Sequence, residues 1–301
     1  MDILSPDTLA ALPAGECGRI CALAADGQRD LQACAERYGP TFPGHPFDPT
    51  FFSTVALSNA FSAYWLTGDQ LRTANRAALW AFGVDWLIDY LATSAEEVDD
   101  IVRRCLAVAH GGAPAADDPI SQLLADIRSD IVDSTSPEAL LRIWCDQVHR
   151  TLDAMAREWH WRSGISGDAV PVLPTPEQYL DNADNLGFAF VYVSHRCFTH
   201  DPHLQRDADL LRDAGWRVQH AIRLLNDLGT YRRDIAWGDL NILMLGPDRT
   251  AVIQQAENII EYCRTVFVSL RAAHPGLVAY LERQIDFNVG FWQLTDYWGD
   301  L

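Results

Sequence analysis

Apolar residues recur at helical spacing along almost the whole chain, and this pattern restricts the possible folds more than any other feature of the sequence. No sustained alternation of apolar and polar residues predicts a β-strand. Thr175 precedes Pro176 and Glu177, an order that is typical of a helix start. The sequence therefore predicts an all-α fold. The expected helices cover residues 50–66, 70–92, 95–110, 119–133, 137–163, 176–198, 205–233, 250–273 and 275–297.

A single domain is expected from the length and from the connecting segments. The 301 residues suffice for one large domain with a sizeable buried core. The segments 111–119, 164–174 and 237–247 are neither long nor biased enough in composition to be interdomain linkers. We therefore expect one domain over residues 46–301, preceded by an N-terminal segment, residues 1–45, that is loosely structured or caps the domain.

The charge of the chain argues against two classes of partner. It has 41 acidic and 23 basic side chains, a net charge of −18. Such a protein repels nucleic acid and anionic membrane surfaces, so neither is expected as a partner. An anionic small molecule could bind only where local arginines or bound metal cations overcome the global charge.

Three features favour a cytoplasmic protein. The seven cysteines form no C-x-x-C pair, which favours reduced thiols over a disulfide frame or a zinc site. The N-terminus lacks the basic flank and the apolar run of a signal peptide. The most apolar window, residues 77–92, is too short for a membrane span and contains two aspartates.

Those two aspartates, Asp85 and Asp89, are the only charged residues of that window. They are four residues apart, so their carboxylates project from one face of a helix on successive turns. Two like charges on an apolar helix are costly unless something cationic compensates them. Either each carboxylate pairs with an arginine or lies on an exposed strip, or the two are hard oxygen ligands for Mg²⁺.

A second polar set lies near the end of the helix expected over residues 205–233. Asn226, Thr230 and Asp234 follow one another at intervals of four residues, so three oxygen donors stack along one helix face. Oxygen donors are the ligands that Mg²⁺ prefers. Arg232 and Arg233 stand beside them and could meet an anion such as diphosphate. Alternatively, the set is an ordinary polar helix C-terminus.

Together these segments resemble those of a known family. Residues 85–89 (DWLID) resemble a reduced form of the D-D-x-x-D motif of class I terpene synthases, and residues 226–234 resemble their N-D-x-x-S/T-x-x-x-E motif. Residues 238–241 (GDLN) and 179–182 (YLDN) are similar to further stretches of the short bacterial diterpene synthases, such as bacterial kaurene synthases. The resemblance covers roughly residues 45–300 and implies a bundle of α-helices around a central apolar cavity.

The resemblance also implies a reaction. In this family Mg²⁺, with three ions expected, helps to ionise an isoprenyl diphosphate, and the carbocation then cyclises inside the cavity. A C20 substrate is expected, geranylgeranyl diphosphate first, so that a diterpene and diphosphate are released. The alternatives are a copalyl-type bicyclic diphosphate and farnesyl diphosphate. A homodimer is a further option, because members of the family commonly form dimers.

The resemblance assigns roles to individual residues. The catalytic residues would be Asp85, Asn226, Thr230 and Asp234, and these four together with Asp89 would bind the metal ions. Diphosphate would be bound by Arg233, Arg232, Arg223 and Tyr297. The implied cavity lining is Phe61, Trp65, Phe82, Trp86, Asn182, Gly187, Phe188, Tyr192 and Trp292.

The chain also departs from the family pattern. Trp86 replaces the second aspartate of the first motif, and Asp234 replaces the usual glutamate. The usual C-terminal Arg-Tyr pair is Asp296-Tyr297 here. The arginine expected within residues 179–187 is absent. Binding of diphosphate must therefore rest on the metal ions and on the arginines named above, or on Arg196.

Related enzyme classes fit less well. A chain-elongating prenyltransferase needs a second D-D-x-x-D, and head-to-head squalene or phytoene synthases need an aspartate where Tyr231 stands. The D-x-D-D of class II cyclases and the paired E-x-x-H of di-iron oxidases are absent. A homologue that binds an isoprenoid without converting it stays open.

Overall fold

Helices account for every regular element in the parts of the chain that the computed structural model describes, namely residues 13–134, 138–165, 173–199 and 208–299. The all-α prediction is confirmed. Residues 1–12, 137 and 205–207 of the expected segments lie outside the described residues. Across the described residues, no helix combines the length and the apolar character that a membrane crossing needs. The α-helices are α2 (Ala14–Tyr38), α3 (Pro49–Ser62), α4 (Gly68–Trp86), α5 (Ala95–Ala109), α6 (Pro119–Asp133), α7 (Glu138–Ile165), α8 (Pro176–Asp181), α9 (Phe188–Phe198), α10 (Ala208–Trp237), α11 (Arg249–Leu270) and α12 (Pro275–Phe291).

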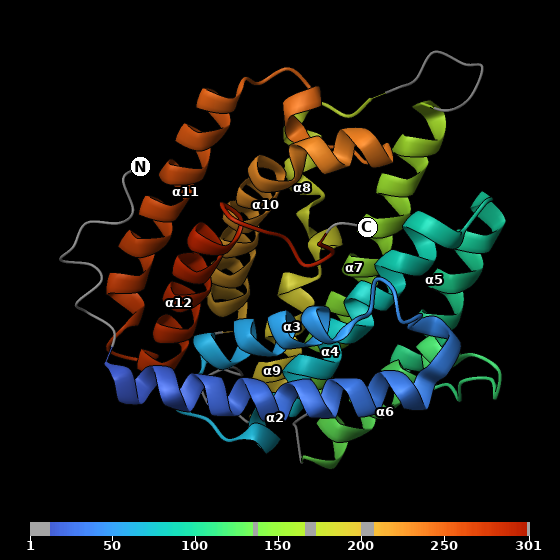
Figure 1. The fold of residues 1–301 in the computed structure, drawn as a ribbon, viewed down its shortest axis with the longest axis horizontal. Helices are drawn as coiled ribbons and strands as arrows, with labels where there is room; N and C mark the ends of the chain where they lie inside the picture. Colours follow the sequence, from blue (N-terminus) through green and yellow to red (C-terminus); the bar gives the residue numbers. More distant parts are fainter. Residues whose placement is uncertain (1–12, 135–137, 166–172, 200–207, 300–301) are drawn as a thin grey trace.

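In Figure 1, α11 and α12 lie on one side of the molecule, α5 and α7 lie on the other, and α4 and α9 cross between them. The helix starts follow the expected capping chemistry. The side chains of Thr67 and Thr175 each accept a hydrogen bond from a backbone N–H three residues later. In return, the side chains of Gln70 and Gln178 accept a hydrogen bond from the backbone N–H of the cap residue. Reciprocal capping of this kind satisfies backbone N–H groups that have no partner inside the helix.

The N-terminal segment contains a long helix, α2, where we expected a loose segment or a cap. Its buried residues Ile20, Ala24, Leu31 and Tyr38 recur at helical spacing and belong to the main hydrophobic core. Gly27 lies where α2 crosses α3 and α4, since a Cβ built there would be 2.6 Å from Asn75 Nδ2. The small buried residues Ala24, Gly27 and Ala35 permit this close contact. They also make the pattern of large apolar residues in this segment weaker.

The helix expected over residues 176–198 is interrupted in the structure. A short 3-10 turn, η3 (Ala183–Leu186), separates α8 from α9. Gly187 ends this turn with φ of +71°, a left-handed conformation that favours glycine. A Cβ on Gly187 would lie 2.9 Å from the Cβ of Ala81, so the break also lets the chain approach α4 closely.

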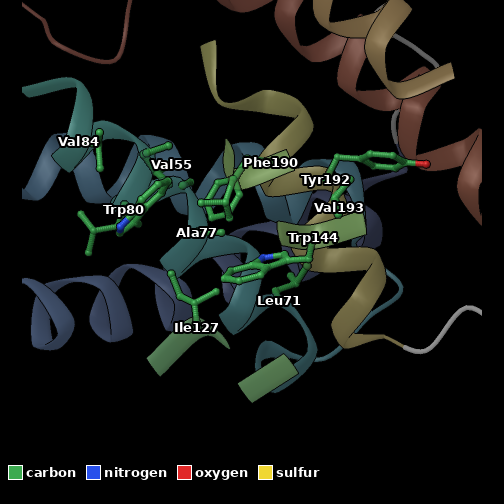
Figure 2. Close-up of a cluster of buried hydrophobic side chains, with 14 of the residues drawn as sticks. Val55, Leu71, Ala77, Trp80, Val84, Ile127, Trp144, Phe190, Tyr192 and Val193 are labelled. Carbon is green, nitrogen blue, oxygen red and sulfur yellow. The ribbon is translucent and has the colours of Figure 1, made fainter. Parts of the chain in front are cut away.

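The main core packs α9 between α4 and α7. Figure 2 shows Trp80 and Trp144 on either side of Phe190, with ring centroids 4.8 and 6.1 Å from it. Each indole N–H has a partner, the carbonyl oxygen of Ile120 at 3.1 Å and Ser194 Oγ at 2.9 Å. Satisfied indoles let both tryptophans be buried completely. This cluster fixes α4, which carries the first pair of aspartates.

Candidate active site

A large cavity opens between α3, α4, α7, α9, α10 and α12, with about 1190 Å³ of empty space when its open mouth is included. Its inner wall is apolar, and its mouth is lined by charged and amide side chains. Asp85 of α4 and Asn226 of α10 both line it, although they are far apart in the sequence. The two sets of oxygen donors singled out in the sequence therefore face one shared space.

The first acidic segment includes an irregular turn of the helix. Asp85 lies on the last turn of α4, and Asp89 lies in a π-helical turn, η2 (Leu87–Leu91), that is closed by a 2.9 Å bond from the Ala92 N–H to the Leu87 carbonyl oxygen. Single π-turns inside helices are frequent at functional sites. Among the described residues, the Asp85 carboxylate makes no hydrogen bond or ion pair, so its oxygens are available to a ligand.

The second set lies along one face of α10. Asn226 and Asp234 line the cavity, whereas Thr230 is buried between them and does not. Thr230 Oγ1 lies 2.7 Å from Asp234 Oδ2, and Asn241 Nδ2 donates to the same oxygen at 2.8 Å. The carboxylate of Asp234 is thus held in place before any ligand arrives, with its other oxygen 3.1 Å from Arg233.

The mouth of the cavity has more carboxylates than cations. Asp85, Asp89, Asp234, Glu158 and Asp239 all line it, and the arginines that line it are Arg223 and Arg233. Burial raises the pKa of Asp85 to about 7, with added repulsion from Asp239 and Glu158, and raises the pKa of Asp89 well above its usual range. Burial also raises the pKa of Asp234. A divalent cation would relieve this repulsion.

The excess of oxygen donors over arginines at the cavity mouth fits a hard metal ion such as Mg²⁺. Asp89 Oδ1 is buried without a hydrogen-bond partner, and its nearest cation is Arg162 Nη1 at 3.3 Å. Within the described residues, no three histidine, cysteine or acidic side chains converge closely enough to hold a metal on their own. The protein would therefore supply only part of the coordination, and oxygens of a ligand or of water would complete it.

We expect binding of metal ions to weaken as the pH falls below about 7. Asp85 must be ionised to act as a ligand, and its raised pKa means that it takes up a proton in that range. The apparent affinity for Mg²⁺ should drop about tenfold per pH unit below this value. The folding stability of the metal-free protein should change in the opposite direction and rise as the pH falls from about 7 towards 4. The reason is that Asp85 takes up its proton at a higher pH in the folded state than in the unfolded state. Titration calorimetry with Mg²⁺ across this range tests the expectation, and a constant affinity would contradict it.

The arginines expected to bind diphosphate occupy different positions. Arg233 lies almost two full turns after Asn226 and faces the cavity with it. Arg223 lines the cavity one turn before Asn226. Arg232 is exposed and does not line the cavity, which corrects its expected role, because it lies about 120° around the helix from Asn226, whereas Arg233 lies within about 20° of it. Arg196 of α9 is also absent from the lining.

The expected lining residues divide into two groups. Phe82, Gly187, Phe188 and Trp292 lie at the cavity wall, as does Tyr297, which was expected to bind diphosphate. The other five lie elsewhere, and these placements correct the expectation. They are Phe61, Trp65, Trp86, Asn182 and Tyr192.

Each of these five has a different environment. Trp65 is 39% exposed on the surface, and Phe61 lies under the Arg283 guanidinium at 4.5 Å. Trp86 follows Asp85 directly, so it turns away from the cavity and stacks on Tyr90 with ring centroids 4.9 Å apart. Asn182 is buried and donates to the Ala154 carbonyl oxygen at 2.9 Å, and Tyr192 packs against Tyr280 at 5.9 Å.

Sequence reasoning missed Glu158 of α7, a buried carboxylate that lines the cavity. Its oxygens lie 3.1 and 3.2 Å from Arg223 Nη2, and Asn185 donates to it as well. Arg223 also contacts Asp227 at 3.4 Å and the hydroxyl of Tyr179. A lone glutamate on a helix gives no sequence signal, since its partners come from two other elements, α10 and η3.

Sequence reasoning also missed Arg162 and Asp239, which connect the two sides of the cavity mouth. Arg162 of α7 donates to the Asp89 carbonyl oxygen at 2.7 Å and to Asp239 Oδ1 at 2.6 Å. Tyr90 donates to Asp239 Oδ2 at 3.1 Å. The π-helical turn of the first acidic segment is thus tied to the turn that follows α10. The spacing of Arg162 and Asp239 in the sequence does not reveal this contact.

Comparison with known proteins shows which family this chain resembles. The model of a family described as terpene synthase family 2, C-terminal metal binding, matches residues 76–278, about two thirds of the chain. The ent-pimara-9(11),15-diene synthase of Streptomyces sp. (strain KO-3988) is 24% identical over 274 residues, which cover 90% of each chain.

Solved structures share the fold. Linalool/nerolidol synthase from Streptomyces clavuligerus, in complex with 2-fluorogeranyl diphosphate, is 16% identical with a TM-score of 0.67, over 89% of this chain and 94% of that one. The 2-methylisoborneol synthase from Streptomyces coelicolor A3(2), in complex with Mg²⁺ and geranyl-S-thiolodiphosphate, is 14% identical with a TM-score of 0.68, over 93% of each chain.

Proposed function

We propose that this chain, which belongs to terpene synthase family 2 and is therefore a class I terpene synthase, acts on a C20 isoprenyl diphosphate, with geranylgeranyl diphosphate as the substrate. The products would be a cyclised diterpene and diphosphate. The observation that carries the proposal is that Asp85 and Asn226 line one cavity whose mouth is rich in oxygen donors and whose inner wall is apolar.

One observation supports a C20 substrate. The relative that aligns over 90% of both chains is a bacterial diterpene synthase. The shorter substrate analogues in the solved relatives belong to proteins only 14% and 16% identical to this chain.

The oxygen donors at the mouth would hold Mg²⁺. Asp85 and Asp89 would contribute from α4 and its π-helical turn, and Asn226 and Asp234 would contribute from α10. Thr230 would join them once its hydroxyl turns from Asp234 to a metal ion. When bound, Mg²⁺ supplies Lewis-acid neutralisation of the diphosphate charge, and three ions are proposed.

The remaining side chains would direct the reaction. Arg233, with Arg223, would stabilise the negative charge that collects on the diphosphate as the allylic C–O bond breaks and its electron pair leaves with the diphosphate. Phe82, Phe188 and Trp292 would exclude water and present aromatic faces to the carbocation. Loss of a proton to the departing diphosphate, with the C–H electrons forming a double bond, would end the reaction.

The experiment is turnover by purified protein with Mg²⁺ and a set of substrates. Geranyl, farnesyl, geranylgeranyl and copalyl diphosphates are each supplied, with gas chromatography and mass detection of hydrocarbons and an assay of released diphosphate. We expect geranylgeranyl diphosphate to give a C20 hydrocarbon. A preference for the copalyl or farnesyl substrate would transfer the proposal to that alternative, and diphosphate release from none of them would contradict it.

A further inference from the structure

The last described residues cross the mouth of the cavity. After α12 the chain, residues 293–299, runs back over the middle of the molecule (Figure 1). We call this segment the C-terminal strap. Its Tyr297 and Trp298 line the cavity, and Trp298 packs on Phe51 and Phe82 with ring centroids 5.7 and 5.2 Å away. The strap is thus part of the wall that would surround a bound hydrocarbon.

Asp296 fixes the strap with both oxygens of its carboxylate. Oδ1 accepts bonds of 2.7 Å from the backbone N–H groups of Trp298 and Gly299, which sets the turn of the strap. Oδ2 lies 2.9 Å from Arg233 Nη1 and ties that turn to α10. Both side chains of this ion pair are largely buried, with 16% and 18% exposed, so solvent screens the attraction only in part.

Arg233 is the cavity arginine nearest to the metal-binding face of α10. Its Nη2 lies 3.1 Å from Asp234 Oδ1, and its guanidinium lies over the ring of Trp237 at 4.9 Å. Its Nε and Nη1 are buried without a hydrogen-bond partner, and Nη1 contacts Asp296 as an ion pair at 2.9 Å. The guanidinium therefore contacts two carboxylates and still has donors without a hydrogen bond.

We propose that Asp296 is an internal competitor that occupies Arg233 until a diphosphate takes its place. This inference rests on the proposed function, because it concerns the same diphosphate. A bound diphosphate brings at least two negative charges next to Asp296. Arg233 is the only ion-pair partner of Asp296 among the described residues, so the Asp296 carboxylate and the diphosphate would compete for one guanidinium.

The exchange would connect binding of the head group to the wall of the cavity. When diphosphate displaces the Asp296 carboxylate from Arg233, the link between the strap and α10 is lost, while the Oδ1 bonds still shape the turn. Tyr297 and Trp298 can then adjust around the substrate. Without substrate, Asp296 helps to compensate the largely buried charge of Arg233.

The Asp296→Asn variant separates the two roles of this side chain. The amide oxygen of asparagine can still accept the bonds from Trp298 and Gly299, but the negative charge that pairs with Arg233 is removed. Inorganic pyrophosphate with Mg²⁺ is the probe, and titration calorimetry of the full chain is the measurement. We expect Asp296→Asn to bind pyrophosphate about fivefold more tightly than the wild type.

A matched control removes the same charge elsewhere. Asp286 is 62% exposed on α12 and pairs with Arg264 at 3.2 Å, outside the cavity. Asp286→Asn should leave pyrophosphate affinity unchanged. In an Arg233→Gln background, Asp296→Asn should give a smaller gain, because only the direct repulsion between the carboxylate and pyrophosphate remains to be relieved. An equally large gain in that background, or a weaker affinity in Asp296→Asn alone, would overturn the proposal.

Hydrogen exchange gives a second readout. The amides of Trp298 and Gly299 should change their exchange rates when pyrophosphate and Mg²⁺ bind to the wild type, because the strap is released from Arg233. An unchanged strap in a protein that does bind pyrophosphate would refute the exchange but leave the proposed function standing. If the wild type binds no pyrophosphate at all, the proposed function fails instead.

Discussion

Asp85→Ala and Asn226→Ala are each expected to lower kcat/KM at least about a hundredfold and to leave the helical fold intact. Each side chain belongs to one of the two sets of oxygen donors, and removing one metal ligand leaves the diphosphate charge incompletely neutralised as the C–O bond breaks. Neither side chain is part of the hydrophobic core. Steady-state kinetics with saturating Mg²⁺ and the preferred diphosphate measure the effect, and far-UV circular dichroism checks the fold.

The controls lie on the same or a comparable helix. Asp69→Ala removes a carboxylate from the first turn of α4, where it is 80% exposed and pairs with Arg72. Asn258→Ala removes an exposed amide from α11. Both should retain wild-type kinetics. Normal turnover by Asp85→Ala and Asn226→Ala would show that the cavity mouth is not the catalytic site.

The helices could be predicted because their signals are local. Periodic apolar residues, proline at helix starts and hydroxyl caps all act within a few residues of the chain, and Thr175 caps its helix as expected. The helix α2 was missed because glycine and alanine make up much of the face that packs against α3 and α4, and a count of large apolar residues does not detect that face.

Helical geometry could also have separated the two neighbouring arginines of α10. Arg233 shares a face with Asn226 and Asp234 closely enough to line the same cavity, whereas Arg232 points into solvent. The environment of Trp86 has the same explanation, since it is adjacent to Asp85 and must point elsewhere. Spacing within one helix was therefore sufficient to predict which side of the helix faces a ligand.

Contacts between distant elements could not be predicted from the sequence. Glu158 and Arg162 stand in stretches without a motif, and Asp239 lies in the GDLN stretch without an assigned role. The importance of all three depends on which helices pack together. The ion pair between Arg233 and Asp296 is of the same kind, because the sequence shows only that an aspartate precedes Tyr297. The role of a charged residue at such a position becomes visible only when the fold places an opposite charge within about 3 Å of it.

Glu158→Ala is expected to lower the free energy of unfolding by about 3 kcal/mol, because it removes one half of a buried ion pair. Arg223 is only 7% exposed, and its guanidinium contacts both oxygens of Glu158. Without this partner the charge stays buried, and Asp227 at 3.4 Å compensates it only in part. Urea unfolding followed by circular dichroism measures the change.

Two further variants show whether the buried charge is the cause. Asp153→Ala breaks an exposed pair on the same helix, in which Arg157 lies 3.7 Å away and both side chains are 52% exposed, so the cost should stay below about 1 kcal/mol. Adding Arg223→Met to Glu158→Ala removes the unpaired charge with little change of volume and should recover part of the lost stability. If the double variant is instead less stable than Glu158→Ala, packing around Arg223 and its contact with the ring of Tyr179, rather than the ion pair, stabilises this side of the cavity.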